Sequence, residues 1–219
     1  MKHSSRARAS EQMRDENGTD RIVEIPLFPL RTVLFPGGAM PLRIFEPRYL
    51  EMISECLKTG GRFGISLIRE GSETGRAATF QEIGTLGSIS YWQQLPNGML
   101  GITVRGEQRF RILSSRTLPN QLIRAQVELL PSERRLPVPE HCHHARELLG
   151  HLLEQLGLPY NKPPFHFEDA GWVGCRLAEL LPLSLGQKQQ LLQLNDPLER
   201  LEHLHALLKK MGIRRTGAE

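Results

Sequence analysis

The hydrophobic pattern of this chain changes once, at a proline- and charge-rich joint over residues 132–139. Before the joint, short apolar runs rich in β-branched and aromatic residues are separated by Gly and Pro, which is typical of strands. After it, leucines recur every three or four residues, which is typical of amphipathic helices. Strands followed by helices, rather than strands alternating with helices, predict an α+β chain.

Residues 21–131 predict a barrel or folded sheet, because several short strand segments follow one another at close spacing. Pro96-Asn97-Gly98 predicts a tight turn between two of the strands, since Asn and Gly accept positive φ. One helix interrupts the strands. Glu46 is its predicted cap, Pro47 fits its first position, and Gly60 fits the position just past its end.

Residues 140–213 predict a C-terminal bundle of about four helices. Ser184 and Gln187 have the spacing of a capping box, in which two side chains satisfy free N–H groups at a helix start. Asp196-Pro197 marks another start, with a capping residue followed by proline at the first helical position.

Composition restricts the class of protein. No apolar run approaches the roughly 18 residues of a transmembrane helix, and residues 1–20 lack the apolar core of a signal peptide, so we expect a cytoplasmic protein. The same polar residues predict a disordered tail, and residues 214–219 are expected to fray. The net charge of +4 is thinly spread, which argues against nucleic-acid binding.

Common catalytic motifs are missing from the sequence. It contains no G-x-x-x-x-G-K-[ST] phosphate loop, no G-x-G-x-x-G dinucleotide motif, no G-x-S-x-G elbow and no H-E-x-x-H zinc motif. We therefore expect no catalytic residues and no cofactor.

The strongest metal candidate is His141-Cys142-His143-His144, with His151 further along the same helical segment. Adjacent helical residues point about 100° apart, so one ion cannot bind all of them. We interpret them as partly exposed residues at a helix start. A zinc site would need further ligands, for which His166 and Cys175 are guesses.

Four charged residues lie inside or beside apolar segments, where charges usually need partners: Arg43, Glu46, Arg48 and Arg109. We interpret them as ion pairs and caps that join the helix start to the sheet, with Arg109 as the first choice of partner for Glu46. A ligand-contacting cluster is the alternative interpretation.

Three blocks follow one another in an order that carries a family resemblance: Ile25-Pro26-Leu27-Phe28-Pro29-Leu30, Val33-Leu34-Phe35-Pro36-Gly37, and Pro41-Leu42-Arg43-Ile44-Phe45-Glu46-Pro47-Arg48-Tyr49. They resemble the opening of the Lon N-terminal domain, the substrate-binding domain of ATP-dependent proteases. The segments 104–112 and 178–192 resemble later parts of the same domain. The resemblance covers roughly residues 22–211 and implies a PUA-like β-barrel followed by a small helical bundle.

The resemblance also implies recognition of polypeptides. Because the printed sequence ends after the helical bundle, we expect a stand-alone member without ATPase and protease domains. The hypothesis is a non-enzymatic polypeptide-binding module, an adaptor or holdase in protein quality control. Its expected partners are unfolded or exposed apolar polypeptide segments and a separate protease or chaperone. The alternative is RNA binding, since PUA-like barrels in other families bind RNA.

A set of apolar residues near the first turns is too large for a turn region unless they pack or bind something: Phe35, Met40, Leu42 and Tyr49. Packing is the first interpretation, and the exposed members are the candidates for polypeptide contact. The contact would lie in a groove between barrel and helices, or it would be made by strand addition at a sheet edge. With 6% aromatic residues and little net charge, the sequence predicts a modest apolar groove rather than a charged trough.

Overall fold

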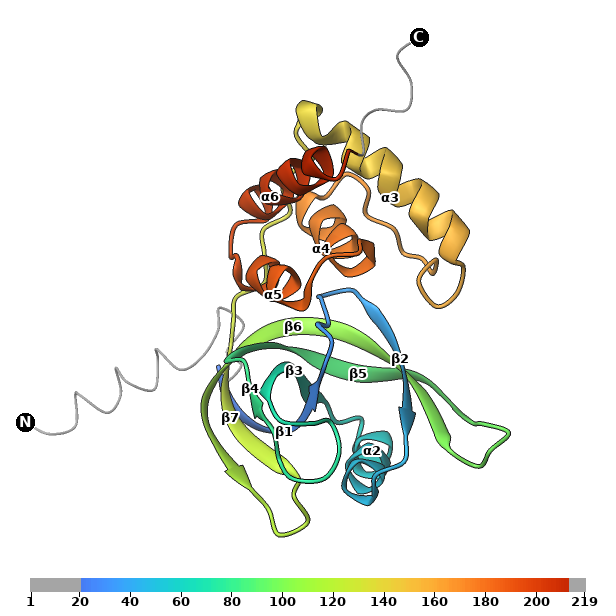
Figure 1. Cartoon of the computed structure of the whole chain (residues 1–219), viewed down its shortest axis with the longest axis vertical. Coiled ribbons are helices and arrows are strands. Elements are labelled where there is room, and N and C mark those ends of the chain that lie inside the picture. Colours follow the sequence, from blue (N-terminus) through green and yellow to red (C-terminus); the bar gives the residue numbers. More distant parts are fainter. Residues whose placement is uncertain (1–20, 213–219) are drawn as a thin grey trace, which may run out of the picture.

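The computed structural model describes residues 21–212 and shows a β-barrel with a helical bundle stacked on one end (Figure 1). The α+β class, the PUA-like barrel with one inserted helix, and the C-terminal bundle are all confirmed. The predicted disordered tail at residues 1–20 and the predicted frayed end at 214–219 lie outside the described residues.

The barrel is built from strands that pair in the order β1-β7-β6-β5-β3-β4. β1 also pairs in parallel with β3, so β1, β7, β6, β5 and β3 form a closed ring. β2 pairs with β6 outside this ring. The strand bounds are β1 (Ile22–Leu30), β2 (Ala39–Ile44), β3 (Phe63–Glu70), β4 (Thr79–Phe80), β5 (Ile83–Gln94), β6 (Leu100–Thr117) and β7 (Ile123–Leu129).

The longest strand, β6, connects the parts of the barrel. Its first half pairs with β2 on one side and β5 on the other, and its second half pairs with β5 and β7. The predicted turn at Pro96-Asn97-Gly98 joins β5 to β6, and Gly98 has a φ of 80°. This hairpin extends beyond the barrel (Figure 1).

The inserted helix α2 (Pro47–Thr59) has the predicted ends. Pro47 occupies the first turn, and Gly60 ends the helix in the left-handed conformation with a φ of 67°. Its buried face includes Tyr49, whose ring stacks on Phe28 with centroids 4.0 Å apart. The helix therefore packs on the barrel, at the end away from the bundle (Figure 1).

Four α-helices follow the joint. A short 3-10 helix, η1 (Glu140–Cys142), leads into α3 (His143–Leu156), and α4 (Ala170–Leu180), α5 (Leu185–Gln193) and α6 (Pro197–Lys210) follow. Ser184 forms the predicted capping box with Gln187, and the Asp196 carboxylate accepts a hydrogen bond from the Leu198 N–H at 2.9 Å. No helix among the described residues is long and apolar enough to cross a membrane.

Barrel and bundle share a hydrophobic core. Val33, Phe35 and Leu67 come from the barrel, yet they belong to the same buried cluster as the leucines of the bundle, such as Leu149, Leu177 and Leu204. The barrel has two further clusters of its own. The two halves are therefore packed as one body, and the surface between them is a fixed feature of the fold.

Candidate functional site: a groove between barrel and bundle

A glycine-rich turn sets the shape of the surface where barrel and bundle meet. Gly37 donates to the Gly106 carbonyl at 2.8 Å, and Gly106 donates to the Gly38 carbonyl at 2.9 Å. A Cβ atom on Gly106 would lie 2.1 Å from the Phe35 carbonyl oxygen. Only glycine therefore allows this turn to lie against β6, and the turn brings the start of β2 under α4.

A hollow of about 550 Å³ opens beside this turn. The barrel supplies one wall from β5 and β6, and the other wall consists of α4 and the segment that precedes it. Its lining residues are Gly37, Gly38, Ala39, Ser90, Tyr91, Gln93, Thr103, Arg105, Leu158, Pro159, Tyr160, Lys162, Pro164, Trp172 and Arg176.

A second hollow of about 380 Å³ adjoins the first, and both are lined by Tyr91, Gln93 and Thr103. It continues across the β2–β6–β5 part of the sheet to Pro41 and Arg43. In the strand register, Thr103 of β6 lies between Pro41 of β2 and Tyr91 of β5. The two hollows thus form one continuous groove, which we call the β2–α4 groove.

Aromatic side chains gather at the β2–α4 groove despite their low content in the chain. Tyr91 is 57% exposed on the barrel wall. Tyr160 and Trp172 line the opposite wall, and the Trp172 ring is in edge contact with Phe167, with centroids 5.2 Å apart. Tyr160 and Trp172 are partly buried against the bundle core, so an exposed ring on one wall faces partly exposed rings on the other, and these flat apolar surfaces can pack against a ligand.

The groove is cationic. Arg43, Arg105 and Lys162 are exposed and form no ion pair within residues 21–212, and no Asp or Glu is among the lining residues of either hollow. This groove therefore adds unpaired positive charge to the apolar lining that the sequence predicted. Composition could not reveal this, because a net charge is a sum over the chain and carries no information about position.

The floor of the groove rests on a buried ion pair between Arg176 and Glu179 of α4. A Cβ atom on Gly38 would lie within 2.9 Å of both side chains, so the turn sits directly on the pair. Burial raises the pKa of the Glu179 carboxyl, and the Arg176 guanidinium opposes that rise. Because Glu179 balances the charge of Arg176, the unpaired positive charge of the groove comes from Arg43, Arg105 and Lys162.

A second buried cluster holds the two walls together. Glu133 of the joint forms ion pairs with Arg109 of β6 at 3.3 Å and with Arg200 of α6. Arg109 also donates to the carbonyl oxygens of Leu192 and Leu194 at 2.8 and 2.6 Å. This cluster, the Glu133 clamp, links β6 of the barrel, the joint and the helices of the bundle.

The structure separates the apolar residues that the sequence singled out. Phe35 and Tyr49 are buried in two different core clusters and cannot contact a polypeptide. Met40 and Leu42 are half-buried and pack against the barrel core, although Leu42 also borders the second hollow. On β2, the neighbours Pro41 and Arg43 face the groove instead, because successive strand residues point to opposite faces.

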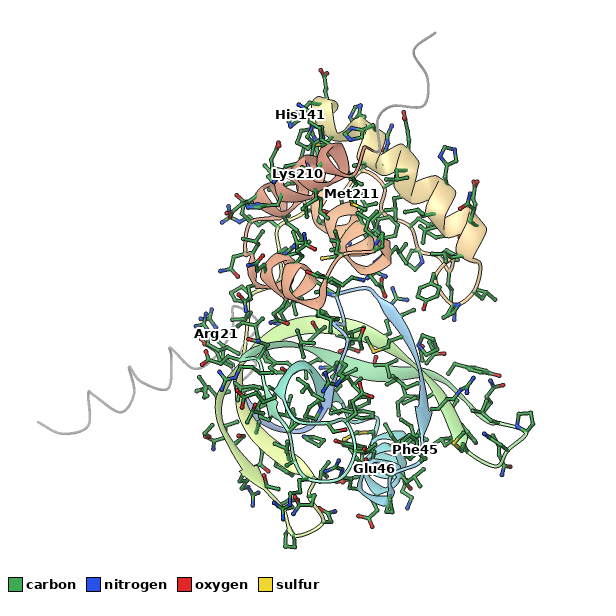
Figure 2. All side chains as sticks on the ribbon, viewed as in Figure 1. Arg21, Phe45, Glu46, His141, Lys210 and Met211 are labelled. Carbon is green, nitrogen blue, oxygen red and sulfur yellow. The ribbon has the colours of Figure 1, made fainter. Side chains whose placement is uncertain are left out.

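The expected pairing of Glu46 with Arg109 is wrong. Glu46 lies at the start of α2, far from the bundle that Arg109 contacts (Figure 2). Its carboxylate instead lies 2.8 Å from Nε of Arg48, and it makes no side-chain cap. Arg48 is buried and donates to the Gln121 carbonyl at 2.9 Å. The pair therefore holds a loop against α2, and Arg43 takes no part in it.

Known proteins resemble this chain in sequence and in fold. A family model described as "ATP-dependent protease La (LON) substrate-binding domain" matches residues 24–210. The chain belongs to this family. A solved Lon N-terminal domain protein from Xanthomonas campestris is 36% identical to this LON domain, has a TM-score of 0.71, and is matched over 84% of this chain and 98% of that one.

Curated relatives are much longer. Lon protease 2 of Herpetosiphon aurantiacus is 29% identical over 91% of this chain and 25% of its own length, and Lon protease of Escherichia coli K12 is 27% identical over 85% and 25%. The LON domain described here thus spans about a quarter of the first of these relatives. Protein cereblon of Xenopus tropicalis is 30% identical over 66% of this chain and 31% of its own length.

Proposed function

We propose that this LON domain is a non-enzymatic polypeptide-binding module of protein quality control, acting in the cytoplasm as an adaptor or holdase for a protease or chaperone. The observation that supports the proposal is the β2–α4 groove, which is long, open and lined by aromatic rings from both halves of the molecule. A groove lined in this way fits an extended chain that presents apolar side chains.

The groove favours side-chain contacts over strand addition. β2 pairs only with β6 among the described strands, so one of its edges is open. Pro41 lies in the middle of β2, and a proline within a strand turns its missing N–H to the free edge. An added strand would lose a hydrogen bond there. We therefore place the polypeptide across the rings of Tyr91, Tyr160 and Trp172.

The charge of the groove selects among polypeptides. Arg43, Arg105 and Lys162 are unpaired within the described part of the chain, and they flank the aromatic rings. A segment that places Asp or Glu beside Leu, Phe or Tyr can satisfy both features, whereas a Lys-rich segment is repelled. Affinity for any one short segment should be on the order of micromolar, since an extended peptide loses chain entropy when it binds.

A matched pair of variants tests the site. Tyr91→Ser should weaken binding of a fluorescent Leu- and Phe-rich acidic peptide by about tenfold, the usual scale for removing one aromatic anchor. Trp92→Ser is the control, because Trp92 is the next residue of β5, is equally exposed at 58%, and lies outside the lining of both hollows. Fluorescence anisotropy gives both affinities, and equal losses in the two variants would contradict the proposed site.

Salt distinguishes a polypeptide from a nucleic acid. Because few cations are involved, moderate salt should weaken the affinity for the peptide by only a few fold. Arg105→Gln should make that affinity less dependent on salt. A single-stranded RNA that bound instead, with a loss of orders of magnitude over the same range, would replace the polypeptide proposal with RNA binding. We also expect the purified chain neither to hydrolyse ATP nor to cleave casein, and ATP-stimulated cleavage would refute the non-enzymatic part.

A further inference from the structure

The far tip of the helical bundle brings together three side chains of the kinds that bind transition metals. His141 and Cys142 lie on η1, and Glu202 comes from the facing side of α6. One imidazole nitrogen, the thiol sulfur and one carboxylate oxygen all lie within 4.8 Å of one another. Figure 2 places His141 at the end of the bundle opposite the barrel, so this cluster is separate from the β2–α4 groove.

The donor set suits zinc. Imidazole nitrogen, thiolate sulfur and carboxylate oxygen bind Zn²⁺ at about 2.0–2.3 Å, which places the ligand atoms of a tetrahedral site about 3.5 Å apart. His141 and Glu202 already contact each other, and both side chains are about half exposed, at 58% and 51%. An ion can therefore reach the site from solvent, and small side-chain rotations bring all three atoms onto it.

A candidate fourth donor, His205, lies one helical turn beyond Glu202 and outside the group of three whose ligand atoms are within 4.8 Å of one another. His205 has its Nδ1 atom buried and without a hydrogen-bond partner in the described structure. Its ring is in edge contact with those of His141 and His144, with centroids 5.9 and 4.7 Å apart. Glu-x-x-His on one helix facing His-Cys on another segment resembles the spacing by which helical bundles hold metals between facing helices.

We propose that His141, Cys142, Glu202 and His205 form a zinc site that joins η1 to α6. Binding replaces the thiol proton of Cys142 with a sulfur–zinc bond and releases that proton to solvent. The ion links the first turn after the joint to the last helix. The earlier guess of His166 or Cys175 as additional ligands is replaced, because His166 packs by Trp172 and Cys175 contacts Arg200.

The test uses the chain without a histidine tag, stripped of metal and then titrated with Zn²⁺ against a chromophoric chelator. We expect one equivalent to bind and to raise the melting temperature. His141→Ala and Glu202→Gln change exposed side chains, so both variants should fold, and each should lose affinity by more than about tenfold. His151→Ala changes an exposed histidine of α3 outside the cluster; it is the control and should bind as wild type does.

Cobalt supplies an independent readout of the sulfur ligand. Co²⁺ bound to the wild-type chain should show a thiolate-to-cobalt charge-transfer band, and Cys142→Ser should lose that band. The proposal is overturned if His141→Ala and Glu202→Gln bind Zn²⁺ as tightly as the His151→Ala control. It is equally overturned if cobalt binds without the thiolate band, or if the stripped chain takes up no metal.

Discussion

At the scale of single residues, the groove depends on a position where a side chain has no room. Gly106 lies so close to the 35–38 turn that an added Cβ would lie 2.1 Å from a backbone oxygen, which cannot rotate away. Gly106→Ala should therefore displace the turn and destabilise the fold by about 2–3 kcal/mol, the usual cost of overpacking. Urea denaturation of the variant measures this change.

Gly150 is the matched control for that substitution. It lies in the middle of α3, and a Cβ atom there would meet nothing within 4 Å. Gly150→Ala should stabilise the fold by about 0.5–1 kcal/mol, because alanine loses less conformational freedom in a helix. If both alanine variants lost stability alike, the close approach at Gly106 would not be the cause.

In the metal-free chain, two buried acidic protons make stability sensitive to alkaline pH. Burial raises the pKa of the Tyr49 hydroxyl from 10.0 to about 12, and burial, with Glu202 nearby, raises the pKa of the Cys142 thiol from 9.0 to about 11. The folded state thus holds both protons more tightly than the unfolded chain does. The stability that these two protons contribute is complete below the pKa values of the unfolded chain, and it is lost as pH rises through the pKa values of the folded chain.

The free energy of unfolding should therefore decline between about pH 9 and pH 12. Tyr49→Phe removes one ionising group, so its decline above about pH 10 should be shallower than that of the wild type. Tyr91→Phe, which changes an exposed tyrosine, is the control for removing a phenol. Urea titrations across this range give the profiles, and identical slopes in all three proteins would contradict the argument.

At the scale of elements, the Glu133 clamp fixes the bundle on the barrel. Arg109 is 4% exposed and Arg200 is fully buried, so both depend on the one carboxylate between them. Glu133→Gln leaves two buried guanidinium groups without a counter-charge and should destabilise the fold by about 3 kcal/mol. Glu107→Gln, which breaks the exposed pair with Arg62, should cost less than about 1 kcal/mol. Similar losses in thermal unfolding would mean that the clamp is not a buried network.

The elements themselves could be predicted because their signals are local. Pro47 and Gly60 mark the ends of α2, and Asn97-Gly98 forms the turn between β5 and β6. Ser184 caps the start of α5, and each residue lies where its backbone chemistry is required. The partner of Glu46 could not be predicted, since it depends on which segments the barrel brings together. Arg109 was favoured because it is a charge within an apolar segment. In the folded chain Glu46 lies at the end of the barrel away from the bundle, whereas Arg109 contacts the bundle.

The sequence could predict that a groove would lie between barrel and helices, but it could not predict which residues line it. Its walls come from segments near residues 37–43, 90–105 and 158–176, and their meeting is a property of the tertiary fold. Met40 and Leu42 pack against the barrel core, although Leu42 also borders the groove, and their neighbours Pro41 and Arg43 face outward because successive strand residues point to opposite faces. The alternation of strand residues was the signal available in the sequence. It indicates that the exposed neighbour of each core residue is the better candidate for contact with a ligand.

At the scale of the whole molecule, the shared core and the Glu133 clamp predict that barrel and bundle unfold together. Chains of this length often separate into domains that unfold independently. Here Val33, Phe35 and Leu67 of the barrel are packed into the bundle core, so unfolding the bundle would expose barrel residues to water. Loss of one half should then destabilise the other.

The two tryptophans of the chain allow a direct measurement, since Trp92 lies on β5 and Trp172 on α4. Trp172→Phe leaves a reporter only in the barrel, and Trp92→Phe leaves one only in the bundle. For each variant, the melting midpoint by tryptophan fluorescence should agree with the midpoint by far-ultraviolet circular dichroism, which follows the helices. Comparing the two probes within each variant removes any effect of the substitution on stability. A barrel reporter that melts apart from the helices would show two independent domains, and the β2–α4 groove would then be a movable junction rather than a fixed binding site.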